Sequence, residues 1–338
     1  MATLQMHVAV EHVELAAPFR ISGFVFERQE IVVVTLSDGA LRGRGEASGV
    51  YYLGDDAKKM VAAIEACRAE IERGAGRESL QHLLPPGGAR NAVDCALWEL
   101  DAIRSGRSVW QLAGLRAARP LVTTFTLSAD DPAIMADGAR KYSSARAIKM
   151  KLTGEIDLDG ARVRAVRAAR PGVWLGVDAN QGYDIATLGR LIPVLVEANV
   201  SLLEQPLARG READLQGFNS PVPIAADESA LSLVDVPGLV GRFEVVNIKL
   251  DKCGGLTEGL AMAAKGRELG LKVMVGNMVG TSLAMAPGFV VGQLCDVVDL
   301  DGPIFLERDR TPAATYADGK IWCGEDVWGG RALASQQT

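Results

Sequence analysis

The sequence predicts an α/β protein in which a β/α barrel of the TIM type follows a smaller α+β domain. From about residue 120, short apolar runs alternate with segments of helical spacing, at a repeat that suits one strand, one helix and two loops. Eight such runs favour a closed barrel over an open sheet. The nearest competitor is a doubly wound nucleotide-binding sheet, but neither G-x-G-x-x-G nor G-x-x-x-x-G-K-[ST] occurs in the chain.

The composition fits one large domain and one smaller domain. The chain has 338 residues, of which 48% are hydrophobic, so it can bury a large core. A barrel needs roughly 200 residues, which leaves room for one further domain. We expect a smaller N-terminal domain, here called the capping domain, over residues 1–118, the barrel over 119–310 and a C-terminal tail over 311–338.

Charge and targeting signals exclude several kinds of partner. The net charge of −6 argues against binding to nucleic acid or to an anionic membrane surface. No apolar run reaches the roughly 18 residues that span a bilayer, and the N-terminus lacks the pattern of a signal peptide. The five cysteines are scattered and contain no C-x-x-C, as is typical of free thiols in a reducing compartment. We expect a cytoplasmic protein.

The N-terminal part predicts three strands followed by helices. Alternating and β-branched residues favour strands at residues 4–15, 30–36 and 41–47. The turn Ser37-Asp38-Gly39 predicts a hairpin between the last two of these strands. We expect loops over 18–30 and over 48–56, the second of which carries two tyrosines. Helical spacing predicts helices at residues 57–74, 77–84, 91–106 and 108–115.

The barrel elements follow in strict alternation. Strands are expected at residues 121–127, 146–151, 173–178, 200–204, 222–227, 244–249, 271–276 and 296–300. Helices between them are expected at residues 131–143, 157–169, 185–198, 211–217, 257–269 and 281–293. The tail contains Ala317-Asp318-Gly319, which predicts one more hairpin.

Charged residues recur where successive barrel strands end. Because those ends converge on one mouth of a barrel, the side chains should meet there. Three carboxylates at one mouth repel one another, and a hard divalent cation, most simply Mg²⁺, relieves that repulsion. Each acid taken alone could instead be a helix N-cap. The residues are Lys149, Lys151, Asp178, Glu204, Asp227 and Lys249.

This ordered set resembles the enolase superfamily, in its muconate-lactonizing subgroup. The resemblance is carried by AIKMKLTG, GVDANQGY, LLEQPL, IAADES and NIKLDKCGG, and it covers nearly the whole chain. It implies a modified (β/α)7β barrel, and a tail that packs on the capping domain. The segment VDLDGP near residue 300 is similar to that of the dipeptide epimerases. We also expect a homo-oligomer.

The resemblance implies specific roles for the lysines. It assigns Lys151 and Lys249 as bases on opposite faces of the substrate, with Lys149 as the helper of Lys151. A nearby ammonium and the cation would lower the pKa of Lys151 toward neutrality. The resemblance further implies that Mg²⁺ bound to Asp178, Glu204 and Asp227 would stabilise an enediolate. Two bases then invert the carbon by 1,1-proton transfer.

Further residues are candidates for substrate binding. Asp299 and Asp301 would clamp the free ammonium of a dipeptide, although a turn with solvated carboxylates is the alternative. Asn180 and Glu228 could each hold a water bound to the metal, orient a lysine or cap a helix. Lys252 is expected to make a structural contact.

The side chain of the substrate is left open. In this family the loop at residues 18–30 closes over the barrel mouth. Arg20 and Arg28 could pair with the distal carboxylate of L-Ala-L-Glu, whereas Phe24 in the middle of that loop favours a hydrophobic second residue. The first hypothesis is thus an epimerase that inverts the α-carbon of the C-terminal residue of L-Ala-X dipeptides. The alternatives to it are an N-acylamino acid racemase, an o-succinylbenzoate synthase, a muconate cycloisomerase, or a metal-binding structural protein that has lost activity.

Histidine usage narrows the chemistry. The three histidines, His7, His12 and His82, all precede the barrel. The barrel therefore cannot supply a histidine as base or metal ligand, and Ser-His-Asp hydrolysis would need a histidine from the other domain.

Overall fold

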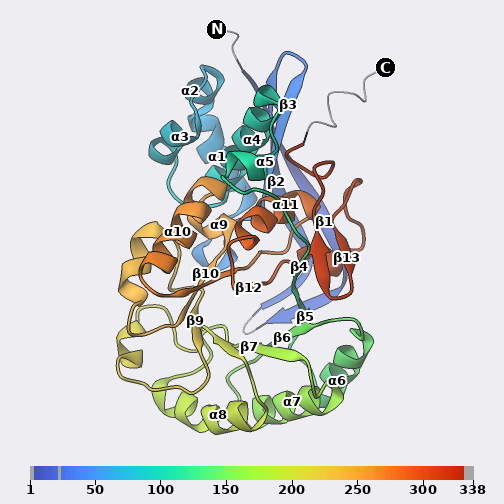
Figure 1. Cartoon of the computed structure of the whole chain (residues 1–338), viewed down its shortest axis with the longest axis vertical. Coiled ribbons are helices and arrows are strands. Elements are labelled where there is room, and N and C mark those ends of the chain that lie inside the picture. Colours follow the sequence, from blue (N-terminus) through green and yellow to red (C-terminus); the bar gives the residue numbers. More distant parts are fainter. Residues whose placement is uncertain (1–3, 22–23, 331–338) are drawn as a thin grey trace.

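The computed structural model describes residues 4–21 and 24–330. A three-stranded antiparallel sheet and a group of helices form the N-terminal domain, which caps one end of an eight-stranded parallel sheet in these described residues. Figure 1 shows this capping domain in the upper part of the molecule and the barrel below it. The predicted fold class, a β/α barrel with an α+β capping domain, is confirmed.

The first two strands are longer than the sequence predicts. β1 (Gln5–Ile21) and β2 (Phe24–Asp38) form a long antiparallel pair, and β3 (Leu41–Ala47) pairs with β2. The predicted loop over 18–30 is therefore wrong for residues 18–21 and 24–30, because the ladder resumes after a bulge with Phe19 opposite Phe26. Residues 22 and 23 of that predicted loop lie outside the described residues. The end of this hairpin reaches the barrel (Figure 1), where Ala129 N donates to Arg20 O at 3.2 Å.

The helices of the capping domain pack against its three-stranded sheet. The helix predicted over 57–74 is divided at Cys67, whose φ of −105° and ψ of 6° are not helical. Gly43 and Gly45 let α4 approach β3 closely, since a Cβ at either position would lie about 2 Å from an α4 carbonyl oxygen. The elements are η1 (Tyr51–Leu53), α1 (Ala57–Ala66), α2 (Arg68–Glu72), α3 (Arg77–Leu83), α4 (Gly88–Ser105) and α5 (Val109–Leu112).

The barrel strands run in sequence order and are buried on both faces. They are β5 (Thr124–Leu127), β6 (Ala147–Lys151), β7 (Trp174–Asp178), β8 (Leu202–Glu204), β9 (Ile224–Ala226), β10 (Val245–Ile248), β11 (Lys272–Val275) and β12 (Val297–Val298). The helices on the outside are α6 (Pro132–Lys141), α7 (Ile156–Ala169), α8 (Ile185–Glu197), α10 (Leu256–Glu268) and α11 (Ser282–Gly292). The shorter helical turns are η2 (Glu212–Leu215), η3 (Leu233–Leu239), α9 (Leu250–Cys253) and η4 (Gly302–Phe305).

Side chains, rather than a backbone ladder, join the first barrel strand to the last. In the described residues the sheet runs from β5 to β12 without a ladder between those two, so the barrel is nearly closed rather than closed. Leu300 N donates to Thr123 Oγ1 at 2.9 Å, and Thr126 N donates to Asp301 Oδ2 at 2.6 Å. The seam therefore depends on residues next to the mouth.

The tail completes a small second sheet. β13 (Thr315–Ala317) and β14 (Lys320–Trp322) form the predicted hairpin, and β14 pairs with β4 (Leu121–Val122), which the sequence had joined to β5. Farther along, Trp328 Nε1 donates to Arg44 O at 2.9 Å in the capping domain. Among the described residues, no helix is long and apolar enough to cross a membrane.

Candidate active site

Three carboxylates meet at the mouth of the barrel. Asp178 and Glu204 end β7 and β8 and are paired in register, and Asp227 directly follows β9. One carboxylate oxygen from each lies within 4.8 Å of the others, and all three side chains are almost fully buried. Such a cluster of hard oxygen donors is a site for a divalent cation. The prediction that these three acids lie together as a metal site is confirmed.

Burial and the neighbouring lysines set the charge of these acids. Burial raises the pKa of Glu204 to about 7, and the charge of Asp178 adds to this effect. Burial also opposes ionisation of Asp178, yet Lys151 and Lys149 hold its pKa below the usual range. Burial also opposes ionisation of Asp227, but Lys249 and Lys252 hold the pKa of this acid below its usual range. The lysine ammonium groups therefore neutralise part of the negative charge that a bound cation would otherwise balance.

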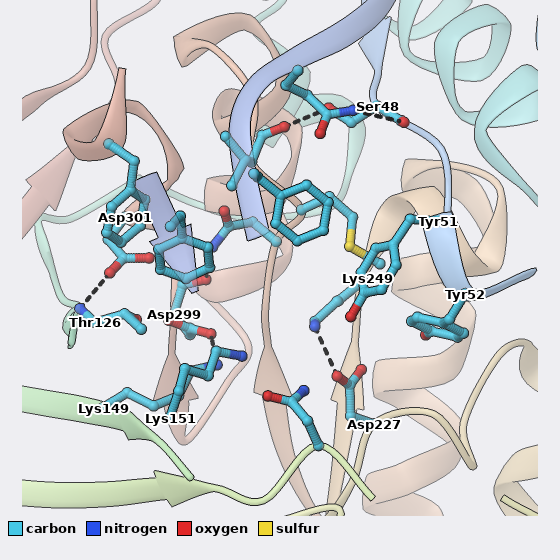
Figure 2. A pocket seen from close by; sticks show the side chains of 18 of the residues that line it. Ser48, Tyr51, Tyr52, Thr126, Lys149, Lys151, Asp227, Lys249, Asp299 and Asp301 are labelled. Atoms are coloured by element: carbon cyan, nitrogen blue, oxygen red, sulfur yellow. Dashed lines mark hydrogen bonds and ion pairs between the residues drawn. The ribbon is translucent and has the colours of Figure 1, made fainter. Parts of the chain in front are cut away.

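The lysines approach the metal centre from two sides. Lys151 Nζ lies 2.6 Å from Asp178 Oδ2, and Lys249 Nζ lies 2.7 Å from Asp227 Oδ2. Figure 2 shows Lys149 and Lys151 on one side of the pocket and Lys249 on the other. Burial lowers the pKa of Lys149 and Lys249, but nearby carboxylates raise both above the usual value. A carbon atom of a substrate bound in the pocket would therefore lie between Lys151 on one side and Lys249 on the other.

Lys252, which the sequence predicted to make a structural contact, makes that contact with a metal ligand. Its amino group is buried and donates to Asp227 Oδ1 at 2.6 Å, to Asp227 O at 2.5 Å and to Asn247 O at 3.0 Å. It therefore positions a metal ligand rather than contacting the cavity. Its spacing of three residues from Lys249, at the start of α9, is the signal that could have indicated this contact.

The two acids after β12 have different surroundings. Asp299 accepts hydrogen bonds from Thr124 Oγ1 and Lys149 Nζ, so both of its oxygens are engaged. Asp301 accepts from Thr126 N through Oδ2, and both acids line the cavity. Burial, together with the charge of Asp299, raises the pKa of Asp301 to about 7. Of the two, Asp301 is better placed to offer an oxygen to a ligand.

A cavity opens over these charged groups, and residues of both the capping domain and the barrel line it. One wall of the cavity is aromatic and comes from the capping domain and from η4. The aromatic residues of this wall are Phe19, Phe26, Tyr51, Tyr52 and Phe305. Asn180 also lines the cavity, from the barrel. Tyr51 packs edge-on against Phe26, with ring centres 5.2 Å apart. The second loop, with its two tyrosines, therefore forms part of the site.

Some of the predicted substrate residues lie away from the cavity. Phe24 is 46% exposed and supports Phe26 and Tyr51 from outside, at 4.7 Å between the ring centres of Phe24 and Tyr51. Arg20 is half exposed and lies 3.9 Å from Asp130. Among the described residues that line the cavity there is no arginine, and Phe26 takes the place that the sequence suggested for Phe24.

The loop that carries the tyrosines is fastened to the barrel. Asp251 Oδ1, two residues after Lys249, accepts from Ser48 N at 2.8 Å and from Gly49 N at 3.0 Å. Ser48 Oγ donates to Val279 O at 2.6 Å. Figure 2 shows Tyr51 and Tyr52 on the same side of the pocket as Lys249 and Asp227.

Comparisons with known proteins agree with this arrangement. The family model "Enolase C-terminal domain-like" matches residues 134–323, and "Mandelate racemase / muconate lactonizing enzyme, N-terminal domain" matches residues 3–114. The chain is 37% identical over 307 residues to L-Ala-D/L-Glu epimerase of Escherichia coli K12, covering 91% of this chain and 96% of that protein.

Two further relatives differ in their substrates. N-acetyl-D-glutamate racemase of a Pseudoalteromonas species is 37% identical over 303 residues, covering 89% of this chain and 95% of that protein. Hydrophobic dipeptide epimerase of Roseobacter litoralis is 33% identical over 314 residues, covering 89% and 91% of the two chains.

Solved structures show the same fold with ligands bound. An enolase family member from Agrobacterium tumefaciens, with sodium and L-Ala-L-Glu bound, has a TM-score of 0.92 at 38% identity, covering 96% of this chain and all of that one. A dipeptide epimerase from Methylococcus capsulatus, complexed with Mg and L-Arg-D-Lys, has a TM-score of 0.90 at 28% identity, covering 97% and 99%.

A capped β/α barrel with a carboxylate metal site between lysines defines a racemase or epimerase of the enolase superfamily. Within that superfamily, the chain belongs to the mandelate racemase / muconate lactonizing enzyme family. Its relatives make it a dipeptide epimerase-like enzyme with a metal site.

Proposed function

We propose that the protein is a Mg²⁺-dependent epimerase that inverts the α-carbon of the C-terminal residue of L-Ala-X dipeptides. The observation that carries this proposal is the placement of Lys151 and Lys249 on opposite sides of one cavity, each paired with an acid of the metal site. Two bases that face each other suit inversion, whereas a single base suits elimination or exchange on one face.

The residues present fit a magnesium ion. Asp178, Glu204 and Asp227 would hold it, because three buried carboxylates offer the hard oxygen ligands that Mg²⁺ prefers. When bound, the cation supplies charge stabilisation to a substrate carboxylate whose α-proton is being removed. Chelation should therefore abolish turnover, and added Mg²⁺ should restore it. Full turnover in excess EDTA would contradict the assignment.

The lysines carry the proton transfer in this proposal. One of Lys151 and Lys249, unprotonated, takes the α-proton from its face of the substrate. The ammonium of the other gives a proton to the opposite face, so that the carbon is inverted and no proton is gained or lost overall. Lys149, bonded to Glu204 at 3.2 Å and to Asp299, holds a positive charge beside Lys151.

The clamp for the substrate amine separates this function from the alternative. Asp301, with Asp299 behind it, would bind the ammonium of a free dipeptide. The relative that acts on N-acetylglutamate keeps an N-acylamino acid racemase as the second candidate. We expect N-acetylation of a good dipeptide to lower kcat/KM on the order of 100-fold or more. Equal activity on both forms would favour the second candidate.

The cavity wall favours a hydrophobic second residue. Phe19, Phe26, Tyr51 and Phe305 line it, and no arginine stands among its described lining residues to take a distal carboxylate. A hydrophobic dipeptide epimerase is also among the relatives. We expect kcat/KM for L-Ala-L-Phe and L-Ala-L-Leu to exceed that for L-Ala-L-Glu by about tenfold or more. Arg20→Ala and Arg28→Ala should leave this ratio unchanged; a glutamate preference lost in either variant would refute the idea.

A further inference from the structure

Four buried side-chain atoms in the described residues have no hydrogen-bond partner, and all four lie around the metal site. They are Tyr52 Oη, Asn180 Oδ1, Glu228 Oε2 and Asn247 Oδ1. An unpaired buried polar atom costs about 1–3 kcal/mol, and native structures contain few of them. Because all the unpaired atoms of this kind gather at one place, they indicate a group that binds there.

The chemistry of these atoms defines what that group must offer. The amide oxygens of Asn180 and Asn247 can only accept, and the carboxylate of Glu228 accepts when it is ionised, so the missing partners of these oxygens must be donors. The amide of Asn247 is oriented by its Nδ2, which donates to Glu204 Oε1 at 2.8 Å. A carboxylate of a substrate offers no donor and would leave these three oxygens unpaired.

Each acceptor is connected to one of the three metal ligands. Asn180 donates its backbone N–H to Asp178 Oδ1 at 3.0 Å and is held with φ of 40°, in the left-handed region. Glu228 follows Asp227 in the chain, and its side chain is 2% exposed. Its carboxylate is nevertheless outside the group of oxygens that lie within 4.8 Å of one another. It therefore lies beyond the first ring of ligands.

We infer that Glu228, Asn180 and Asn247 form an outer acceptor shell that binds the water molecules accompanying the cation. Mg²⁺ usually keeps several waters, and each water offers two donors directed away from the ion. This inference rests on the proposed magnesium site. It gives the three residues a role in metal affinity, separate from the transfer of protons by Lys151 and Lys249.

The test measures Mg²⁺ binding by calorimetry without substrate. Outer-shell partners are typically worth 10–100-fold in metal affinity. We expect Glu228→Leu and Asn180→Ala each to raise the Kd for Mg²⁺ by about tenfold or more. Glu228→Gln keeps an acceptor and should have a smaller effect. Glu268→Leu is the matched control, because it also removes one carboxylate, which is exposed and paired with Lys265 at 2.8 Å.

Thermal unfolding of the metal-free variants provides a readout that a structural role would move the other way. Removing a buried carboxylate of which Oε2 has no partner should leave the melting temperature of metal-free Glu228→Leu unchanged or higher, while the increase caused by Mg²⁺ becomes smaller. A lower metal-free melting temperature, with the Mg²⁺-induced increase intact, would overturn the inference.

The remaining outcomes separate this inference from the proposed function. If Kd values for Mg²⁺ stay within twofold of wild type while KM for the dipeptide rises, the acceptors bind the substrate and the inference is overturned, but the proposed function stands. If the wild-type protein binds no Mg²⁺, the proposed cofactor fails, and the inference fails with it. If Glu228→Leu does not fold, Asn180→Ala and Glu228→Gln decide the question by the same measurement.

Discussion

Lys151 and Lys249 are buried side chains whose chemistry depends on their positions on opposite sides of the cavity. Lys151→Ala and Lys249→Ala should each lower the rate of epimerisation by about 10³-fold or more, because one face loses its only base. Each variant should still exchange the α-proton of one substrate enantiomer in D₂O, through the lysine that remains. Mass spectrometry measures the exchange, and polarimetry measures inversion. Wild-type epimerisation by either variant would exclude the two-base mechanism.

Lys252 acts at the same scale through Asp227. With its ammonium on both the carboxylate and the carbonyl of that residue, it orients a metal ligand and offsets part of its charge. We expect Lys252→Met to weaken Mg²⁺ binding by about 10–100-fold, measured by calorimetry, because a second group no longer positions the ligand. Lys265→Met, on an exposed face of α10, is the control. Unchanged Mg²⁺ affinity in Lys252→Met would limit this lysine to a role in folding.

At the scale of the element, the hairpin of β1 and β2 is an arm that supplies aromatic side chains to the wall of the cavity. Phe26 lines the cavity, whereas Phe24 stacks behind it at 6.2 Å between ring centres. We expect Phe26→Ala to lower kcat/KM for L-Ala-L-Phe by about 10–100-fold, since a buried aromatic contact is worth about 1–3 kcal/mol. Phe24→Ala should have a smaller effect.

The control for this prediction comes from the same strand. Val25 lies between the two phenylalanines and is 59% exposed, so Val25→Ala should leave kcat/KM unchanged. An equal loss for Phe24→Ala and Phe26→Ala would mean that the arm acts by its overall shape. No loss for Phe26→Ala would mean that the substrate side chain lies elsewhere.

At the scale of the whole molecule, buried acids join the capping domain to the barrel. Glu46 on β3 accepts from Thr281 N at 2.7 Å and pairs with Arg310 at 2.9 Å. Asp251 accepts from Ser48 N and Gly49 N of the loop that carries Tyr51. The active site is therefore complete only when both domains are in place. The division at residues 118 and 310 and the homo-oligomer stay predictions.

One of these contacts should make stability depend on pH. Burial raises the pKa of Asp251 to about 7, although Ser48 N and Gly49 N favour the charged form, and the nearby Asp55 and Glu46 raise it further. An acid with a raised pKa in the folded state contributes stability that is complete below its unfolded pKa. That stability is lost as the pH rises through about 7.

Asp251→Asn keeps an acceptor oxygen for Ser48 N and Gly49 N but does not titrate. The melting temperature of Asp251→Asn relative to wild type should therefore rise between about pH 5 and about pH 8, by roughly 2 °C. Differential scanning calorimetry at both values measures the change. A difference that stays constant with pH would mean that Asp251 keeps its charge throughout this range.

The sequence by itself determined the fold class and the centre of the site. Strand ends, helical spacing and a regular repeat are local signals, and each places one charged residue at one strand end. Because parallel strands converge at a barrel mouth, the sequence pattern alone predicts that Asp178, Glu204 and Asp227 lie close together. The lysine positions follow from the same rule and from the period of two along a strand.

Only the tertiary structure decided how the surrounding residues meet. The extended arm of β1 and β2 forms through long-range pairing and contacts to the barrel, so residues 18–30 read locally as a loop. Phe26 rather than Phe24 lines the cavity because the hairpin register determines which face each ring takes. The contacts of Lys252 with Asp227 and of Asp251 with Ser48 join positions 25 and 203 residues apart. Pairings over such separations are set by packing of the whole chain, which no local pattern encodes.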